Sequence, residues 1–223
     1  MLLKSVCDER VAIKDYGGLR KMAENLVSGL VGPDGVLNVA KLAEVIGKKE
    51  ESVAGKVMIN WRGEDLQKIH NLLHDQSENL PALVKVNGPM PAWLATAIVH
   101  ECHPAEVSLN SQQGYVKILC QAPKETGAGM KEWKVFQKGE WTQVEFTLDG
   151  EISPEQLLKV APPKLPMGSL IIISGRGPLW VAAAVAMSYH GIAQAVACLQ
   201  PKVGSTVCVT HTKEITLGSV IPE

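Results

Sequence analysis

The chain has 223 residues, of which 46% are hydrophobic and 20% charged, and its formal net charge is −1. This composition predicts one large or two small globular domains with a sizeable core, and it argues against a disordered chain. A net charge so close to zero excludes a surface that coats nucleic acid broadly, so duplex DNA is not an expected partner. Only 4% of the residues are aromatic, which argues against a broad platform for stacked bases. A small, locally basic pocket for a short nucleotide remains compatible with these values.

The cysteines and the apolar segments indicate the compartment. The five cysteines are odd in number and none forms a C-x-x-C pair, which argues against a disulfide framework and suits a reducing cytoplasm. Charged residues follow the first methionine almost at once, so the apolar core of a signal peptide is not seen. The longest apolar run, residues 179–187, is well short of the ~20 residues that span a bilayer. We therefore expect a soluble, cytoplasmic protein without a membrane partner.

Residues 1–55 are predicted to form a helical N-terminal segment. Apolar residues at spacings of three and four between positions 19 and 30 indicate one buried helix face, and further helices are expected over residues 39–46 and from about Glu50. Part of this segment has the spacing of a helix-turn-helix, but Glu50 and Glu51 at the start of its second helix would repel phosphate. A packing or dimerisation element is therefore preferred to DNA binding. The residues with that spacing are Ala43, Gly47 and Val53.

From about residue 56, short strands alternate with helices. Each Val- or Ile-rich run is bounded by Gly, Pro or Asn, as strands commonly are. This alternation, with strands that are apolar throughout such as residues 170–173, predicts an α/β fold whose parallel sheet is covered on both faces. The expected strands span residues 56–60, 83–86, 106–109, 115–119, 133–137, 142–148, 170–174, 193–199 and 206–210, and the expected helices span residues 64–74, 91–100, 154–159 and 178–190.

An internal repeat organises this part of the chain. LVKVNGPMPAWLATAIVHECHP at residues 83–104 matches LIIISGRGPLWVAAAVAMSYHG at residues 170–191 at a constant offset of 87. The shared order of strand, Gly/Pro turn, Trp-bearing helix and terminal His predicts two tandem Rossmann-like βαβ units that form a pseudo-dimer within one chain. We expect the first, degenerate unit at residues 56–122 and the second at residues 132–223. The matched pairs are Gly88 and Gly175, Pro91 and Pro178, Trp93 and Trp180, and His103 and His190.

The turn after the first strand of each repeat is a candidate phosphate site. The sequence Ser174-Gly175-Arg176-Gly177 follows a buried strand and precedes a helix. Glycine lets the backbone approach a ligand there, the free N–H groups of the helix start favour a phosphate, and arginine adds donors. Ligands of open α/β sheets bind at this carboxyl edge of the strands, and an ordinary tight turn is the alternative. The first repeat offers Asn87 and Gly88 at this place, without the arginine.

Histidines end both repeat helices. His190 ends the second, and His100 and His103 end the first. Helix capping explains each of them, as do acid/base chemistry and metal ligation. His211 follows a strand and could come near His190 across the sheet edge. Because Glu101 is expected to point elsewhere, no residue is assigned to a metal.

A histidine pair and a lysine also have alternative interpretations. His70 and His74 have the spacing of a ligand pair, but an exposed helix face is the preferred interpretation. Lys202 lies on the loop after the strand that follows His190, where a cation could hold a phosphate. A solvated loop lysine is the alternative for Lys202.

Several strings between residues 133 and 223 carry a resemblance to a known family. They are VEFTLDGEISPEQL, LIIISGRGPLW, a helix that ends in His190, AVACLQPKVG and VCVTHTKEITLGSVI. With these strings the region resembles the Csx-three family of CRISPR-associated ring nucleases. The resemblance implies the CRISPR-associated Rossmann fold superfamily, whose dimers bind cyclic tetra-adenylate or short adenylate RNA across a two-fold axis, and manganese-dependent cleavage of the cyclic messenger. Gln200-Pro201-Lys202 departs from the Asp-Pro-Arg of the family, so an acid is missing and a point-charge lysine replaces arginine.

The leading hypothesis is a cytoplasmic CRISPR-linked protein that binds cyclic oligoadenylate or short RNA, with ring cleavage and homo-oligomerisation left open. If it cleaves, the 2′-hydroxyl would attack the adjacent phosphorus beside positioned imidazoles and cations. Manganese enters as a cofactor through the resemblance alone. The alternatives are a non-catalytic sensor that acts through residues 1–55 and a structural partner subunit. The residues assigned to catalysis are His190, Lys202 and His211, and those assigned to ligand binding are Ser174, Gly175, Arg176, Gly177, Asn87, Gly88 and His103.

Overall fold

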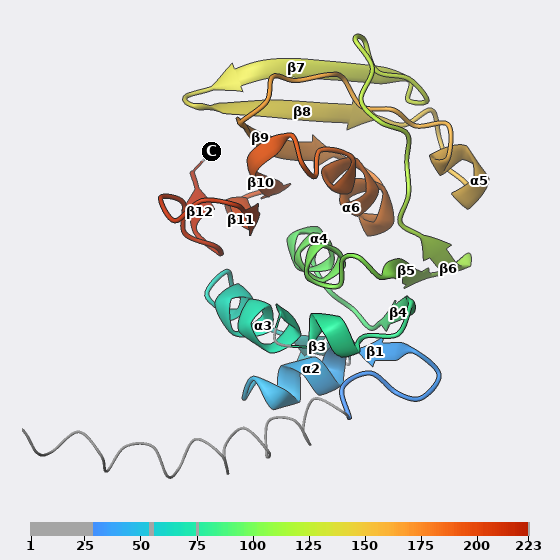
Figure 1. Cartoon of the computed structure of the whole chain (residues 1–223), viewed down its shortest axis with the longest axis vertical. Helices are drawn as coiled ribbons and strands as arrows, with labels where there is room; N and C mark the ends of the chain where they lie inside the picture. The colour runs from blue at the N-terminus through green and yellow to red at the C-terminus, as the bar shows by residue number, and fades with distance from the viewer. Residues whose placement is uncertain (1–28, 54–55, 75, 223) are drawn as a thin grey trace, which may run out of the picture.

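The computed structural model describes residues 29–53, 56–74 and 76–222 as a mixed α/β fold. Figure 1 shows two sheets with a pair of helices between them, and a two-stranded hairpin accompanies the sheets. The helical face expected between positions 19 and 30 lies almost wholly outside the described residues. Within the described ranges, no helix is both long and apolar enough to cross a bilayer.

Four strands form the first sheet, in the spatial order β1 (Val36–Asn38), β4 (Leu83–Asn87), β5 (Glu106–Ser111) and β6 (Gly114–Lys117). The first three strands are parallel, and β6 runs antiparallel to β5. Helix α4 (Ala92–Glu101) connects β4 to β5, as expected for a βαβ unit. Strand β1 was not predicted, because three residues are too few to show a strand pattern.

Six strands form the second sheet, in the order β12 (Val220–Ile221), β11 (Gly204–Thr210), β10 (Ala193–Gln200), β9 (Ser169–Gly175), β8 (Trp141–Thr147) and β7 (Glu132–Lys138). The central strands β8, β9 and β10 are parallel. Helix α5 (Pro154–Leu157) lies between β8 and β9 in the chain, and α6 (Leu179–Ser188) connects β9 to β10.

The expectation of a parallel sheet is confirmed for β1, β4 and β5 and for β8, β9 and β10, and it is wrong for the remaining strands. Strand β7 pairs antiparallel with β8, and β11 pairs antiparallel with β10. Each of these pairs is joined by a short hairpin connection, which cannot carry the chain back to the other end of the sheet as a parallel crossover requires. Both sheets are therefore mixed, with parallel strands at the centre and antiparallel strands at an edge.

Helices α4 and α6 pack against each other between the two sheets (Figure 1). Both helices are apolar on nearly every side: Trp93 and Leu94 of α4 and Trp180 and Val181 of α6 are all buried. A helix without a polar face is stable only when it is covered on all sides. Helix α4 also packs against β10 and β11. The core is consequently shared between the two repeats.

The helix predicted from Glu50 is wrong. Helix α2 (Val39–Val45) confirms the preceding prediction, and Gly47 follows it with a φ of 82°. The Gly47 N–H donates to Glu44 O and the Lys48 N–H to Ala43 O, a pattern that closes a helix rather than a turn between two helices. Strand β2 (Glu50–Val53) then pairs antiparallel with β3 (Lys56–Ile59), so the helix-turn-helix is not formed there.

Helix α3 (Asp65–His74) lies between β3 and β4 in the chain, where a helix was predicted, and the one-turn 3-10 helix η1 (Ser77–Asn79) follows it. Its buried residues Leu66, Ile69 and Leu73 recur at helical spacing, and the helix packs against α4. This packing holds the C-terminal end of α3 beside the C-terminal end of α4, where polar side chains gather.

Candidate functional site

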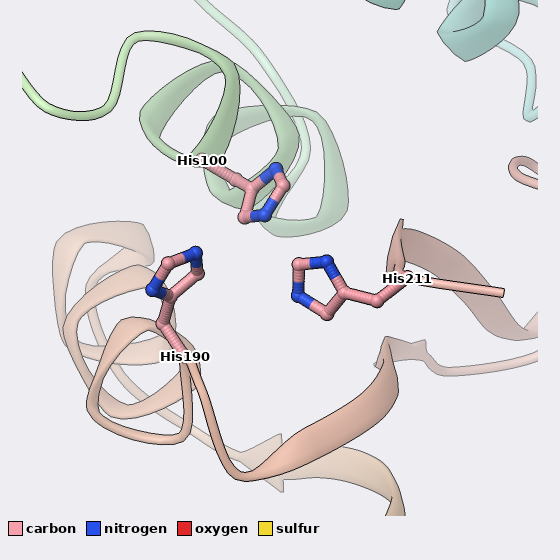
Figure 2. A group of neighbouring side chains, drawn as sticks. All are labelled: His100, His190 and His211. Carbon is pink, nitrogen blue, oxygen red and sulfur yellow. The ribbon is translucent and has the colours of Figure 1, made fainter.

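All six histidines of the chain contact one another or one shared carboxylate. At the centre lie His100, His190 and His211, which each offer a ring nitrogen within 4.8 Å of the others (Figure 2). Their ring centroids are 5.2 to 5.6 Å apart. His103 borders this histidine cluster, with its ring centroid 4.9 Å from that of His190.

The topology of both repeats brings these side chains together. His100 lies in the last turn of α4, and His190 follows the C-terminal cap of α6. His211 directly follows β11, and its backbone N–H donates to Gln194 O at 2.9 Å. Because β11 runs antiparallel to β10, the end of β11 returns to the start of β10, close to the end of α6. The expected approach of His211 to His190 is confirmed.

Burial and mutual repulsion keep two of the imidazoles neutral. Partial burial lowers the pKa of His190, and the positive charges that His100, His103 and His211 carry when protonated lower it further. Burial also lowers the pKa of His211. Repulsion from a protonated His100 lowers this pKa further, whereas attraction to the Glu101 carboxylate raises it. Neutral imidazoles have a free lone pair at physiological pH, so both can accept a proton or bind a metal.

Glu101 holds His100 in place, contrary to the expectation that it points elsewhere. Its carboxylate lies 3.1 Å from His100 Nδ1 and 2.9 Å from His70 Nδ1, and its side chain is 8% exposed. Burial raises the pKa of Glu101, but the hydrogen bonds to His100 and His70 outweigh this effect and keep the pKa below its usual value. With Nδ1 engaged by this carboxylate, His100 is left with Nε2 to face His190 and His211. Carboxylates commonly orient metal-binding histidines by such a contact with the other ring nitrogen.

The histidine cluster suits a divalent transition metal. Three imidazoles with one free position are a common donor set for Zn²⁺, and imidazole also suits other late first-row metals. Manganese prefers carboxylate and carbonyl oxygens, whereas the carboxylate of Glu101 contacts ring nitrogens instead. The donor set therefore fits a metal held by nitrogen better than it fits the manganese that the sequence resemblance implies.

The predicted phosphate-binding residues lie at the opposite ends of the same helices. Ser174 and Gly175 end β9 and are followed by Arg176 and Gly177 before α6, and Asn87 ends β4 and is followed by Gly88 before α4. Lys202 lies in the turn between β10 and β11, with a φ of 70°. The eight residues of β10 separate it from His190, which is roughly 25 Å along an extended strand. The structure thus groups His190, His211 and His103, and it groups the remaining candidates elsewhere.

Two cavities near these turns are related by the repeat. One of about 530 Å³ is lined by Trp93 of the first repeat and Gln200 of the second. Another of about 620 Å³ is lined by Gln113 of the first repeat and by Arg176 and Trp180 of the second. Trp93 and Trp180 are 87 positions apart, as are Gln113 and Gln200, so each cavity combines the tryptophan of one repeat with the glutamine of the other. Arg176 also lines a cavity of about 540 Å³ beside Ser174 and Gly175.

Gln200 has a structural partner that its sequence position did not indicate. Its Oε1 accepts a hydrogen bond of 2.8 Å from Trp93 Nε1, which joins the end of β10 to the start of α4. This is the position at which the chain departs from the acid of the family it resembles. The side chain therefore links the two repeats at the edge where the cavities lie.

Sequence reasoning missed the roles of Glu101, His70 and His74. His70 is half-buried against Glu101, and His74 is stacked on His70, so the two do not simply form a solvated face. Two features of the sequence could have indicated these roles. One is the pair of histidines four residues apart on α3, and the other is Glu101, which directly follows His100 on α4. Their meeting depends on how α3 packs against α4, which one sequence does not reveal.

Comparisons with known proteins identify the C-terminal region. Residues 145–222 match the model of a CRISPR-associated protein family, Cas_csx3. An uncharacterized protein of Aquifex aeolicus (strain VF5) is 32% identical over 85 residues, which cover 36% of this chain and 76% of that relative. The matched region runs from β8 to β12 and contains His190 and His211, whereas His100 and Glu101 precede it. The chain therefore belongs, through its C-terminal region, to the Cas_csx3 family of CRISPR-associated proteins.

Proposed function

We propose that this CRISPR-associated protein binds cyclic tetra-adenylate and opens the ring at the histidine cluster. The observation that carries the proposal is the group of three imidazoles within 4.8 Å, two of which have lowered pKa values. Imidazoles that are neutral at physiological pH are suited to take a proton from a ribose hydroxyl. A short adenylate RNA with the same phosphodiester chemistry is included as a ligand. The proposal includes a cytoplasmic location, which the free thiols of Cys102, Cys120, Cys198 and Cys208 support.

The proposal includes two Rossmann-like units that form a pseudo-dimer, at residues 56–122 and 132–223. Strand, helix, parallel strand and antiparallel strand occur in the same order as β4-α4-β5-β6 and as β9-α6-β10-β11. This division is supported by the packing of α4 against α6. It is also supported by the two cavities, each of which is lined by the tryptophan of one repeat and the glutamine of the other. A ligand with two-fold symmetry, such as a ring of four nucleotides, fits a surface built in this way.

In this proposal the ring binds at the edge that carries the two cavities. Their volumes of about 530 and 620 Å³ lie in the range of small-molecule sites, and each is lined by residues of both repeats. The turns at Asn87-Gly88 and Ser174-Gly177 bring backbone N–H groups of α4 and α6 toward the ligand phosphates. Arg176 and Lys202 add positive charge there.

Binding and cleavage at opposite ends of α4 and α6 require two chains. A phosphodiester held at the cavity edge of one chain reaches a histidine cluster only when a second chain stacks on that edge. A homo-oligomer is therefore part of the proposal. In such a stack, Arg176 and Lys202 of one chain stabilise the phosphate while His190 and His211 of the next chain exchange protons with it.

The cleavage step is an internal transfer that needs no water. His190 takes the proton of a 2′-hydroxyl, whose oxygen bonds to the adjacent phosphorus while the bond from phosphorus to the 5′-oxygen breaks. The second imidazole, His211, relays the proton that His190 has taken to the leaving 5′-oxygen, so both imidazoles end the step neutral. The product is a linear oligoadenylate with a 2′,3′-cyclic phosphate and a 5′-hydroxyl group. A divalent metal bound by His100, His190 and His211 would occupy the lone pairs that proton transfer needs, so it would supply positive charge near the phosphate in place of acid–base catalysis by these imidazoles.

A second candidate function is a non-catalytic sensor of the same ligand. The hydrogen bond between Trp93 and Gln200 favours it, because this glutamine occupies the position of the family acid and links the two repeats. Ligand binding in the adjacent cavity could then change how the repeats pack. Such a change would be passed to residues 1–55, of which residues 29–53, with β1, α2 and β2, are described.

Incubation of the full chain with labelled cyclic tetra-adenylate, in chelator, in Mn²⁺ and in Zn²⁺, separates these functions. Binding together with the appearance of linear product supports the ring nuclease. Binding without product under all three conditions favours the sensor and contradicts cleavage. The absence of binding contradicts both proposals.

A further inference from the structure

A second group of metal-binding side chains lies beside the histidine cluster. His70, His74 and Glu101 each offer a ligand atom, and these atoms all lie within 4.8 Å of one another. None of the three belongs to the group formed by His100, His190 and His211. The region that matches the Cas_csx3 family begins at residue 145, so all three also lie outside it.

Helix α3 places the two imidazoles next to each other. His70 and His74 are four residues apart, which puts them one turn apart on the same face of the helix. Their rings are stacked, with centroids 5.2 Å apart and planes inclined by 25°. The buried residues Ile69 and Leu73 precede each histidine by one position and fix the side of the helix that turns toward the core. His74 is exposed, so the site is open to solvent on one side.

Helix α4 supplies the carboxylate from the other side. Glu101 is almost completely buried, yet it points one oxygen at His70 and the other at His100. An anion is stable in such a place only when positive or donating groups surround it. A bound cation between Glu101 and the ring nitrogens of His70 and His74 would meet this requirement fully.

The donor set selects the class of ion. Two imidazoles and one carboxylate with an open fourth position form a donor set found in zinc enzymes, and the two histidines four residues apart on one helix suit such a site. Calcium and magnesium prefer oxygen ligands only, so nitrogen donors disfavour them. We propose that His70, His74 and Glu101 bind a divalent transition metal of the zinc class.

A metal at this place would act on the histidine cluster through one side chain. Glu101 would bind the ion through the oxygen that now faces His70, while its other oxygen keeps its contact with His100 Nδ1. The ion would fix the orientation of Glu101 and draw charge from it, so it would change how strongly Glu101 holds His100. The site thus has a positioning role and lies apart from the imidazoles to which cleavage is assigned.

Metal counting on the full chain tests this site without any activity assay. The wild type, His74→Ala and His211→Ala are stripped with chelator and dialysed against Co²⁺ or Zn²⁺, and bound metal per chain is measured. Lys68→Ala, at an exposed position of the same helix, is the matched control. His74→Ala is expected to lose one equivalent that His211→Ala and Lys68→Ala both keep, and its thermal melt verifies that it folds.

The outcomes distinguish this site from the histidine cluster. If the three-histidine group binds no metal, the wild type holds one equivalent, His211→Ala still holds it and His74→Ala holds none, which supports the site at α3. If His74→Ala binds as much metal as the wild type, the proposal is overturned. It is equally overturned if the wild type holds one equivalent and His211→Ala holds none.

Discussion

The imidazole of His100 lies 5.3 Å from that of His190, measured between ring centroids, although the two residues belong to different repeats of the sequence. Neither residue could form this contact within its own unit, because it depends on the packing of α4 against α6. A protonated His100 repels a proton from His190 and lowers its pKa. The duplication and the chemistry of the site are therefore connected through one helix pair.

Acidification should destabilise the wild type more than the variant His190→Gln. The folded-state pKa of His190 lies below the ordinary value of about 6.5, so the unfolded chain binds a proton first as the pH falls. The stability that this histidine contributes is present above the ordinary pKa and is lost as the pH falls through the folded-state pKa. Thermal melts in chelator from about pH 7.5 to about pH 5 measure this, and parallel curves for the two proteins would contradict it.

Gly175→Ala should be much more destabilising than Gly191→Ala. Gly175 has a φ of 148°, and a Cβ there would lie 2.7 Å from atoms of the Phe146 ring. Gly191 also has a positive φ, of 84°, but a Cβ there would meet nothing within 4 Å. We expect a loss of about 3 kcal/mol at Gly175, from strain and overpacking, and about 1 kcal/mol at Gly191, from strain alone. Urea unfolding measures both, and equal losses would show that the close contact with Phe146 is unimportant.

Much of the fold could be predicted from the sequence because its signals are local. The runs LVKVN and LIIIS, the Gly/Pro turns and the apolar helices give β4, α4, β9 and α6 nearly to the residue. The hairpin of β2 and β3 could not be predicted in this way, because Glu50 and Glu51 fit the start of a helix as well as a strand. Its formation depends on Gly47, which closes α2 and redirects the chain.

The site was predicted less completely because it is assembled by long-range packing. That His211 could approach His190 across the sheet edge was expected from the sequence, but the antiparallel return of β11 that brings the two residues together was not. The contact of Glu101 with His70 was not expected either, because it depends on the rotation of α3 against α4. The separation of Lys202 from His190 was missed because both residues are near the same strand, β10, but at its two ends.

Gln200→Ala should lower the free energy of unfolding by about 1 kcal/mol. The change removes the acceptor for Trp93 Nε1 and leaves this donor in a partly buried place. Gln112→Ala, at an exposed position in the β5–β6 turn, is the control and should have an effect below about 0.5 kcal/mol. Equal effects in urea unfolding would show that the hydrogen bond between the repeats adds no stability.

Two inactive variants should restore cleavage when they are mixed. His190→Ala removes the proton acceptor and Lys202→Ala removes a cation from the opposite edge, so each homo-oligomer lacks one part of every site. A mixture contains some interfaces with an intact lysine on one chain and an intact histidine on the next. Product formation by an equal mixture, at about a quarter of the wild-type rate if chains exchange freely, is expected because one interface in about four then has both parts intact. A mixture as inactive as its components would argue for a site within one chain.

The most direct test of the proposed chemistry is the rate of linear product formation from labelled cyclic tetra-adenylate by the wild type, His190→Ala and Lys213→Ala. Lys213 is exposed and lies beside the cluster in sequence without being part of it, so its variant is the matched control. We expect His190→Ala to lose about 100-fold or more in rate while its affinity for the ring stays within about threefold of the wild type, since general acid–base catalysis contributes this much. Cleavage by His190→Ala at the wild-type rate, or no cleavage by the wild type under any metal condition, would contradict the assignment of the histidine cluster as the cleavage site.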